Sequence, residues 1–390
     1  MSCQDNSYCL SGIRVLDISR VLALPYATMI LGDLGAEVIK VERPGKGDDT
    51  RSWGPPYFGT ESAYYLCVNR NKKSITVDIK SAKGQKIIKE LAAVSDVVVE
   101  NFSVGELKKY GLDYESLSKI NSKLIYCSLT GFGQNGPKSK LPGYDFMIQG
   151  ISGIMSITGK RDGEPMKVGV GIVDMVAGLY AVTAILASLY KREKSGKGEY
   201  IDIALFDTAV SWLANVGSNY LVSGKIPERF GNAHPNIVPY QTFKAKDGYF
   251  NLAVGNDTQW EKFVSIANRN ELKNERFKTN SDRVRNREEL ITLIESTFLK
   301  KNISEWIEML EKASIPCGRI LTLDKVFSDP QLIFRDMIKT VNHPFGKLKL
   351  VWSPIKLKNY PVKKPTYPPT LGEHTSYVFK TILRHSEDQD

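Results

Sequence analysis

The stretch that contains IRVLDIS (13–19), PYATMILGDLG (25–35) and EVIKVE (37–42) sets the pattern of the first half of the chain. Its first and last pieces are short and apolar or alternating, as in β-strands, and the middle piece has apolar residues at helical spacing. The same order recurs further on, in 74–80, 82–95, 96–102 and 124–129. Strands separated by single helices form parallel sheets with right-handed crossovers. We therefore expect an α/β fold built on a parallel sheet.

Changes in composition divide the chain into three predicted parts. The large α/β domain spans 1–222 and contains a long apolar helix at about 174–194. Residues 223–327 are predicted to form a smaller α+β domain, because Asp247-Gly248 is a strong hairpin signal and amphipathic helices follow it. The segment 328–390 is rich in Pro and Lys and too short for a core of its own, so we expect it to pack back on the large domain.

The composition is that of a globular protein with an anionic ligand. The 390 residues are 42% hydrophobic and 25% charged, and the net charge is +10. We find no apolar run near the ~20 residues of a membrane-spanning helix and no nucleic-acid-binding motif, so we expect neither partner. The first twelve residues, MSCQDNSYCLSG, show neither the apolar core of a signal peptide nor an Arg-rich presequence.

Several common site motifs are absent from the sequence. It contains no GxxxxGK[ST] phosphate loop, no GxSxG elbow and no HExxH. Its five cysteines are scattered without a CxxC pair and it has four histidines, so we predict no metal site. The segment GVGIVD (169–174) begins like a dinucleotide fingerprint, but Asp174 replaces the third glycine, which argues against NAD binding.

Asp174 lies where a glycine-rich loop meets the long apolar helix. An aspartate at such a boundary most often caps the helix N-terminus. The same place can also keep the carboxylate ionised through the helix dipole and make it available as a nucleophile, with the glycines leaving N–H groups free for a developing oxyanion. The residue pattern alone leaves both interpretations open.

Basic residues in the predicted loops and helix ends of the large domain are similarly ambiguous. Each alone is most often a surface charge, whereas together they could bind the phosphates of a nucleotide-like ligand. They are Arg43, Arg51, Arg70, Lys72, Lys73, Lys109, Lys138 and Lys140.

Segments along the whole chain, in order, resemble family III CoA-transferases. These segments are VLDISRVLALPYAT (15–28), LGDLGAEVIKVERPGKGDDTR (31–51), NRNKKSITVDIKSAKG (69–84), VVVENFSVGELKKYGL (97–112), LTGFGQNGP (129–137), GYDFMIQGISG (143–153), VGVGIVDMVAGLYAV (168–182), SDPQL (328–332) and LGEHT (371–375). The resemblance implies a Rossmann-like large domain, a smaller domain and an interlocked homodimer, with the C-terminal segment returning to complete the large domain.

The resemblance also implies the site residues. Asp174 matches the position of the family's catalytic aspartate. The family lines its CoA site at the positions of Val21, Arg43, Val77, Asn101, Phe102 and Lys109. Lys109 departs from the arginine of many relatives and so loses bidentate phosphate geometry. CoA and acyl-CoA are expected as substrates, with no permanently bound cofactor and no metal.

The segments WGPP (53–56), GTESAYYL (59–66) and GNAHPNIVPYQTFKAKDGY (231–249) are most similar to mitochondrial members that move CoA from succinyl-CoA to glutarate. The implied reaction passes through an aspartyl anhydride and an aspartyl-CoA thioester, in the mitochondrion or alternatively the cytoplasm. Leu22 replaces a glutamine of the formyl-CoA transferases, which argues against formate or oxalate. Further candidates for the acyl pocket are Arg20, which would bind the distal carboxylate, and Trp53, Tyr144 and His234, the last in a loop that would cover the site.

Two other functions remain open at this point. The family includes α-methylacyl-CoA racemases, which use a His-Asp pair where this chain has Tyr144-Asp145. Loss of the histidine removes a base that titrates near neutral pH, which argues against proton abstraction from an acyl-CoA. An isomerase is therefore only the second interpretation, after the transferase. A CoA-binding protein without catalysis is the third, and the retained Asp174 argues against it.

Overall fold

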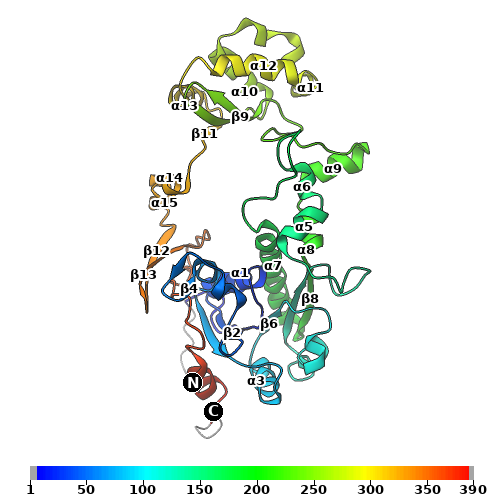
Figure 1. Ribbon diagram of the computed structural model, residues 1–390, viewed down its shortest axis with the longest axis vertical. Coiled ribbons are helices and arrows are strands. Elements are labelled where there is room, and N and C mark those ends of the chain that lie inside the picture. Colours follow the sequence, from blue (N-terminus) through cyan, green and yellow to red (C-terminus); the bar gives the residue numbers. More distant parts are fainter. Residues whose placement is uncertain (1–6, 386–390) are drawn as a thin grey trace. The chain divides into compact units, whose positions relative to one another are not determined.

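The computed structural model describes residues 7–385, and the chain divides into two compact units. Of the described residues, the first unit comprises 7–152, 168–212 and 330–385, and the second comprises 153–167 and 213–329. Figure 1 shows the chain coloured along the sequence.

The first unit is built on a parallel sheet with strand order β5-β2-β1-β6-β7-β8. All neighbouring strands pair in parallel, which confirms the predicted α/β fold. The strands are β1 (Arg14–Asp17), β2 (Glu37–Glu42), β5 (Lys72–Thr76), β6 (Val97–Glu100), β7 (Ile125–Thr130) and β8 (Glu199–Ala204).

Helices cover both faces of this sheet. Leu16 belongs to the apolar cluster that includes α3 (Ala82–Ala93), whereas Asp17 accepts a hydrogen bond from Thr28 of α1 (Ala23–Asp33). Successive residues of a strand point to opposite faces, so α3 and α1 lie on different sides. α7 (Ile172–Ser195) contacts α1, β7 and β8 (Figure 1).

Helix α7 corrects one expectation from the sequence. We expected no stretch that could cross a membrane, but α7 is long and apolar enough to do so by length and composition alone. Its residues Val173, Ala177, Ala181 and Ile185 are buried inside the unit, as in a core helix of a globular protein. The helix ends at Ser195, and Gly196 caps it with a positive φ of 67°, which suits a glycine.

The strand order places a topological switch point between β1 and β6. From β1 the chain runs outward through β2 and β5, and from β6 it runs the other way through β7 and β8. The loops that follow β1 and β6 therefore diverge and leave a crevice at the carboxyl ends of the strands, which is where open α/β sheets bind ligands.

Residues of the C-terminal segment bond to this unit at several points. Arg70 donates to the carbonyl of Val351 (3.0 Å), and Arg51 donates to that of Pro369 (3.1 Å). The N–H of His374 donates to Ser74 (2.8 Å). The other elements of the unit are η1 (Asp49–Ser52), β3 (Tyr57–Phe58), β4 (Glu61–Ser62), α2 (Ala63–Val68), η2 (Leu107–Tyr110), α4 (Tyr114–Leu117), α5 (Asp145–Ile151), α8 (Leu205–Ser211), α15 (Pro330–Phe334), β12 (Ile338–His343), β13 (Gly346–Val351), α16 (Thr375–Tyr377) and η5 (Val378–Ile382).

The second unit packs helices on an antiparallel sheet of order β11-β10-β9. The predicted hairpin at Asp247-Gly248 is present, because β9 (Tyr240–Ala245) pairs with β10 (Gly248–Ala253). Phe298 lies at the centre of its core, with its ring within 5.0 Å of that of Phe243. The other elements are α6 (Ile154–Ile157), α9 (Ala214–Ser223), α10 (Asp257–Ala267), η3 (Asn270–Lys273), η4 (Glu275–Phe277), α11 (Asn280–Arg285), α12 (Arg287–Phe298), α13 (Ile303–Lys312), β11 (Cys317–Arg319) and α14 (Leu323–Phe327).

Residues 153–167 group with the second unit although they precede β8 in the chain. The N–H of Gly231 donates to the carbonyl of Gly159 (3.0 Å), and Arg229 donates to the carbonyls of Lys160 and Gly163. The division into domains at 1–222, 223–327 and 328–390 stays a prediction.

Candidate active site

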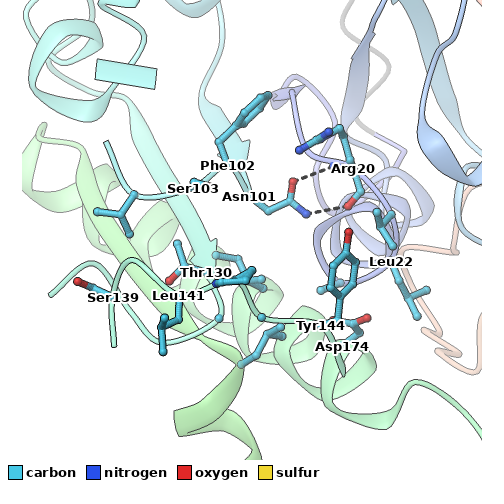
Figure 2. Close-up of a pocket in the computed structure, with 18 of the residues that line it drawn as sticks. Arg20, Leu22, Asn101, Phe102, Ser103, Thr130, Ser139, Leu141, Tyr144 and Asp174 are labelled. Carbon is cyan, nitrogen blue, oxygen red and sulfur yellow. Dashed lines mark hydrogen bonds between the residues drawn. The ribbon is translucent and has the colours of Figure 1, made fainter. Parts of the chain in front are cut away.

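A cavity of about 960 Å³, open to solvent, lies at the switch point of the first unit. Its walls come from the loop after β1, the loop after β6, the end of β7, residues 139–144 and the first turn of α7. Figure 2 shows Asp174 and Tyr144 on one side, with Arg20 and Asn101 near them. The cavity therefore joins several of the residues selected from the sequence: Arg20, Val21, Leu22, Asn101, Phe102, Tyr144 and Asp174.

Asp174 is not the cap of α7. The helix begins two residues earlier, with Gly171 at the N-cap position, and Asp174 is its third residue. The cap interaction comes from Asp145, whose Oδ2 accepts from the N–H groups of Val173 (2.7 Å) and Asp174 (3.3 Å). Within the described residues no donor contacts the Asp174 carboxylate, which lines the cavity. The carboxylate is therefore available to a ligand.

The protonation of Asp174 also differs from the expectation. Burial and the negative charge of Asp145 raise the pKa of Asp174 to about 7. The helix end does not hold it ionised, because Asp145 already occupies the N–H groups that would do so. Near neutral pH the group titrates, so both a nucleophilic carboxylate and its acid form are populated.

Arg20 is fixed by Asn101 through its backbone. The N–H of Arg20 donates to Asn101 Oδ1 (2.9 Å), and Asn101 Nδ2 donates to the carbonyl of Arg20 (2.7 Å) (Figure 2). The guanidinium lies 5.1 Å from the centre of the Phe102 ring. Its Nε is buried and has no hydrogen-bond partner among the described residues. A buried donor without a partner is costly, so a ligand acceptor here would stabilise it.

Val21 has an unusual backbone conformation, with φ of 72°. This region is a clear outlier for a β-branched residue. Its N–H points to Asp48, 3.3 Å from each carboxylate oxygen. Asp48 in turn pairs with the buried ammonium of Lys40 (2.9 Å). Burial alone would raise the pKa of Asp48, but Lys40 lowers it to about 2, so Asp48 stays ionised and holds the loop.

A second cavity, of about 1100 Å³, adjoins the loop after β6. It is lined by Arg43, Val77 and Phe102, and Arg20 and Phe102 line both cavities. Lys109 does not line either cavity, but its Nζ pairs with Glu106 (2.7 Å), which lines the second cavity. Among the six positions of the predicted CoA site, the structure therefore brings five to two adjoining cavities and leaves Lys109 outside.

Three candidates for the acyl pocket have different surroundings. Tyr144 lines the first cavity and is 62% exposed, so its ring can move toward a ligand. Trp53 does not line either cavity, and its ring packs edge-on against Tyr64 at 5.1 Å. His234 belongs to the second unit, where its Nδ1 accepts from the N–H of Asn236 (3.0 Å).

Sequence reasoning missed two groups near Asp174. Burial and the negative charge of Asp174 raise the pKa of the Tyr64 hydroxyl to about 12, so Tyr64 stays protonated. The contribution of Asp174 shows that the two side chains are close enough to interact electrostatically. Asp49 bonds to both Arg20 and Arg43. The sequence GDDTR (47–51) gave no signal that distinguishes Asp49 from Asp48. In residues 7–385 no three His, Cys, Asp or Glu side chains group as a metal site.

A parallel sheet with an unpaired aspartate at its switch point, beside a large second cavity, suits an acyl-transfer enzyme with a nucleotide-like ligand. The model of CoA-transferase family III matches residues 10–375, so the chain belongs to that family, as the resemblance predicted.

Individual relatives cover nearly the whole chain. Human succinyl-CoA:glutarate CoA-transferase is 47% identical over 97% of this chain and 87% of its own length. Succinate–glutarate CoA-transferase of Agrobacterium fabrum is 45% identical over 96% of this chain and 95% of its own. The crystal structure of a CaiB/BaiF family protein from Brucella suis aligns with a TM-score of 0.84 at 47% identity, over 95% of this chain and 98% of that one.

Proposed function

We propose that this CoA-transferase moves CoA from succinyl-CoA to glutarate or a similar dicarboxylate, with Asp174 as the nucleophile. The names of the human and Agrobacterium relatives support the two substrates. The observation that carries the catalytic role is the Asp174 carboxylate itself, which faces the switch-point cavity and accepts no hydrogen bond from the described residues. Neither a structural cap nor an ion pair accounts for that arrangement.

In the proposed first half-reaction the Asp174 carboxylate attacks the thioester carbonyl of succinyl-CoA. The carbon–sulfur bond breaks, CoA leaves as a thiolate, and a succinyl–aspartyl anhydride forms. The thiolate then attacks the aspartyl carbonyl, releases succinate as a carboxylate, and leaves CoA on Asp174 as a thioester. Each step exchanges one activated acyl group for another, so the transfer needs no external energy source.

The second half-reaction reverses this sequence with the acceptor. A glutarate carboxylate attacks the aspartyl thioester, the thiolate leaves, and a glutaryl–aspartyl anhydride forms. The thiolate attacks the glutaryl carbonyl and frees the Asp174 carboxylate. Only the ionised form of Asp174 can begin the cycle, so its pKa of about 7 makes the reaction pH-dependent.

We assign the CoA nucleotide to the second cavity, where Arg43 lies half-exposed and can reach phosphate oxygens. Val21, Val77, Asn101 and Phe102 would line the path toward Asp174. Lys109 is assigned to this site by resemblance; its side chain does not line the cavity, but its ammonium pairs with Glu106, which does. The enzyme is proposed to use CoA thioesters as substrates and no permanently bound cofactor.

We assign the distal carboxylate of the dicarboxylate to Arg20. The supporting contacts are its place in the wall of the cavity, which Asp174 also lines, and its buried Nε without a partner in the described residues. A carboxylate taken out of water needs such a cation, because an unpaired buried charge is costly. Leu22 and Tyr144 line the same cavity and would contact the methylene chain. Trp53 and His234 remain candidates from the sequence.

One experiment tests the transfer and its nucleophile together. The protein is incubated with succinyl-CoA and a panel of free dicarboxylates, and new thioesters are identified by mass. We expect glutaryl-CoA from the wild type and none from Asp174→Asn, which keeps the size of the side chain. A succinyl or CoA adduct should appear on the wild-type peptide that carries Asp174. Substantial transfer by Asp174→Asn would contradict the mechanism.

The same assay separates the two alternative functions. An isomerase would change the configuration of a branched acyl-CoA without a free acid, and this chain has Tyr144 in place of the histidine that the racemases use as a base. A CoA-binding protein without catalysis would leave every thioester unchanged.

We also propose a homodimer, with interlocked chains as the resemblance implies and the C-terminal segment completing the large domain. In the second unit the side chains of Leu221, Val222 and Ile226 are 82%, 88% and 84% exposed, and large apolar residues this exposed favour an interface. The mass in solution by light scattering tests this proposal. The mitochondrion, or alternatively the cytoplasm, stays the predicted compartment, and neither a membrane nor a nucleic acid is a predicted partner.

A further inference from the structure

Asp49 bridges the two arginines to which the proposed function assigns the substrate anions. It is the first residue of η1, in the segment after β2. Its Oδ1 lies 2.5 Å from Nη2 of Arg43, and its Oδ2 lies 3.4 Å from Nη1 of Arg20. The exposed fractions of the three side chains are 40% for Asp49, 49% for Arg43 and 38% for Arg20, so a ligand can reach each of them.

The bridge connects the two cavities. Arg43 lines the second cavity, Asp49 lines the first, and Arg20 lines both. The neighbouring carboxylate, Asp48, is engaged elsewhere, with Lys40 and with Thr50. One exposed carboxylate is therefore shared between the guanidinium assigned to the CoA phosphates and the guanidinium assigned to the distal carboxylate.

We propose that Asp49 is a positioning residue that competes with the substrate anions for both arginines and makes the two anionic sites antagonistic. This inference rests on the proposed roles of Arg20 and Arg43. When a phosphate takes Arg43, Asp49 no longer shares its charge and pairs with Arg20 alone. A substrate carboxylate must then displace an Asp49 that pairs only with Arg20, so the substrate carboxylate binds more weakly.

The antagonism is reciprocal. Because coupling between two binding sites is the same in both directions, a free dicarboxylate on Arg20 weakens CoA by the factor by which CoA weakens the dicarboxylate. The loop itself does not need to move, since Asn101 holds the backbone of Arg20 through two hydrogen bonds. During the reaction, this antagonism helps the free acid to dissociate from the CoA-bound enzyme, and it helps CoA to dissociate from the enzyme that holds a free acid.

The test is a set of binding measurements by calorimetry on the full chain. The affinity of CoA and that of glutarate are each measured alone and with the other ligand saturating. In the wild type we expect each ligand to weaken the other by roughly twofold to fivefold, the range of an exposed ion pair. In Asp49→Asn each ligand alone should bind more tightly by a similar factor, and the antagonism should disappear. Asp49→Glu, which keeps the charge, should retain it.

A matched control comes from Asp78, which lines the second cavity, is exposed, and accepts from the N–H of Lys80 (3.0 Å). Asp78→Asn removes one negative charge from the second cavity, which Arg43 and Arg20 also line, and no ion pair of Asp78 with an arginine is among those found in the described residues. It should leave the antagonism intact. An Asp49→Asn protein with the wild-type coupling, or an Asp78→Asn protein that loses it equally, would overturn the proposal.

Arginine variants separate this inference from the proposed function. Arg43→Ala should weaken CoA, and less so dephospho-CoA if Arg43 binds the sugar phosphate, while Arg20→Ala should weaken glutarate. Unchanged affinities in both variants would refute the assigned anion sites and the inference with them. Weakened affinities in both, with unaltered coupling in Asp49→Asn, would refute the role of Asp49 alone.

Discussion

Asp145→Asn should shift the pH profile of the transferase toward acid. Burial and the Asp145 charge together raise the pKa of Asp174 to about 7, so kcat/KM for the acyl-CoA should rise with pH through about 7 in the wild type. Asparagine keeps an oxygen that can accept from the N–H groups of Val173 and Asp174, but it removes the negative charge. The cap is preserved and the repulsion is lost. The hydrogen bond that Asp145 Oδ1 accepts from Gln149 Nε2 (2.5 Å) is lost as well, because an amide nitrogen takes the place of that oxygen.

The expected size follows from the ionised fraction of Asp174. A charge beside a carboxyl typically shifts its pKa by about 1–3 units, and burial, the larger cause here, remains in the variant, so we take a fall of about one unit. At pH 6 the ionised fraction then rises from roughly one tenth to roughly one half, and kcat/KM rises about fivefold. At pH 8 Asp174 is almost fully ionised in both the wild type and the variant, so the ratio of their kcat/KM values stays near one. The assay is the initial rate of glutaryl-CoA formation between pH 5.5 and 8.5 at low succinyl-CoA.

A second variant separates charge from cap. Asp145→Ala should shift the profile similarly but should also destabilise the fold by about 1 kcal/mol, since the N-terminus of α7 loses its acceptor. Thermal unfolding would show this difference. A wild-type profile that is flat from pH 6 to 8 would refute Asp174 as a titrating nucleophile. An unmoved midpoint in Asp145→Asn would show that burial alone sets the pKa.

Two further predictions concern the loop after β1. Arg20→Ala should lower kcat/KM for glutarate far more than for a monocarboxylate of similar length, because only the dicarboxylate has a distal charge; equal losses in competition assays would remove Arg20 from that role. Lys40→Met should destabilise the protein by roughly 3–5 kcal/mol in chemical unfolding, because Lys40 and Asp48 are both fully buried side chains and the variant leaves Asp48 unpaired. Lys46→Met, a change at an exposed neighbouring lysine, is the control and should alter stability by less than about 0.5 kcal/mol.

The sequence was sufficient for the sheet and for the hairpin of the second unit. Both depend on local patterns: alternating strands and helical spacing for the sheet, and Asp247-Gly248 for the turn. The start of α7 was placed two residues late, and that error made Asp174 look like a cap. The true cap, Asp145, lies 29 residues away in the chain, and no local pattern indicates such a contact.

The absence of a local signal also explains why the sequence did not reveal the side-chain contacts of the candidate site. The sequence analysis selected Arg20, Arg43 and Asn101 as separate positions, but it did not indicate that Asp49 joins two of them. Nor could it place Lys109, since the sequence does not show whether the ammonium lines the cavity itself or pairs with Glu106, three residues before it, which does line it. Contacts between side chains from different loops depend on where the sheet puts those loops.

The clamp by Asn101 has a consequence for enzyme engineering. Asn101 binds the N–H and carbonyl of residue 20 and makes no use of its side chain. Exchanging Arg20 therefore leaves both hydrogen bonds in place, so a library randomised at position 20 keeps the scaffold while varying the charge and length offered to the acceptor. Position 101 should be held constant in such a library. Acids that carry an amine or an alkyl group in place of the second carboxylate are the first targets to screen.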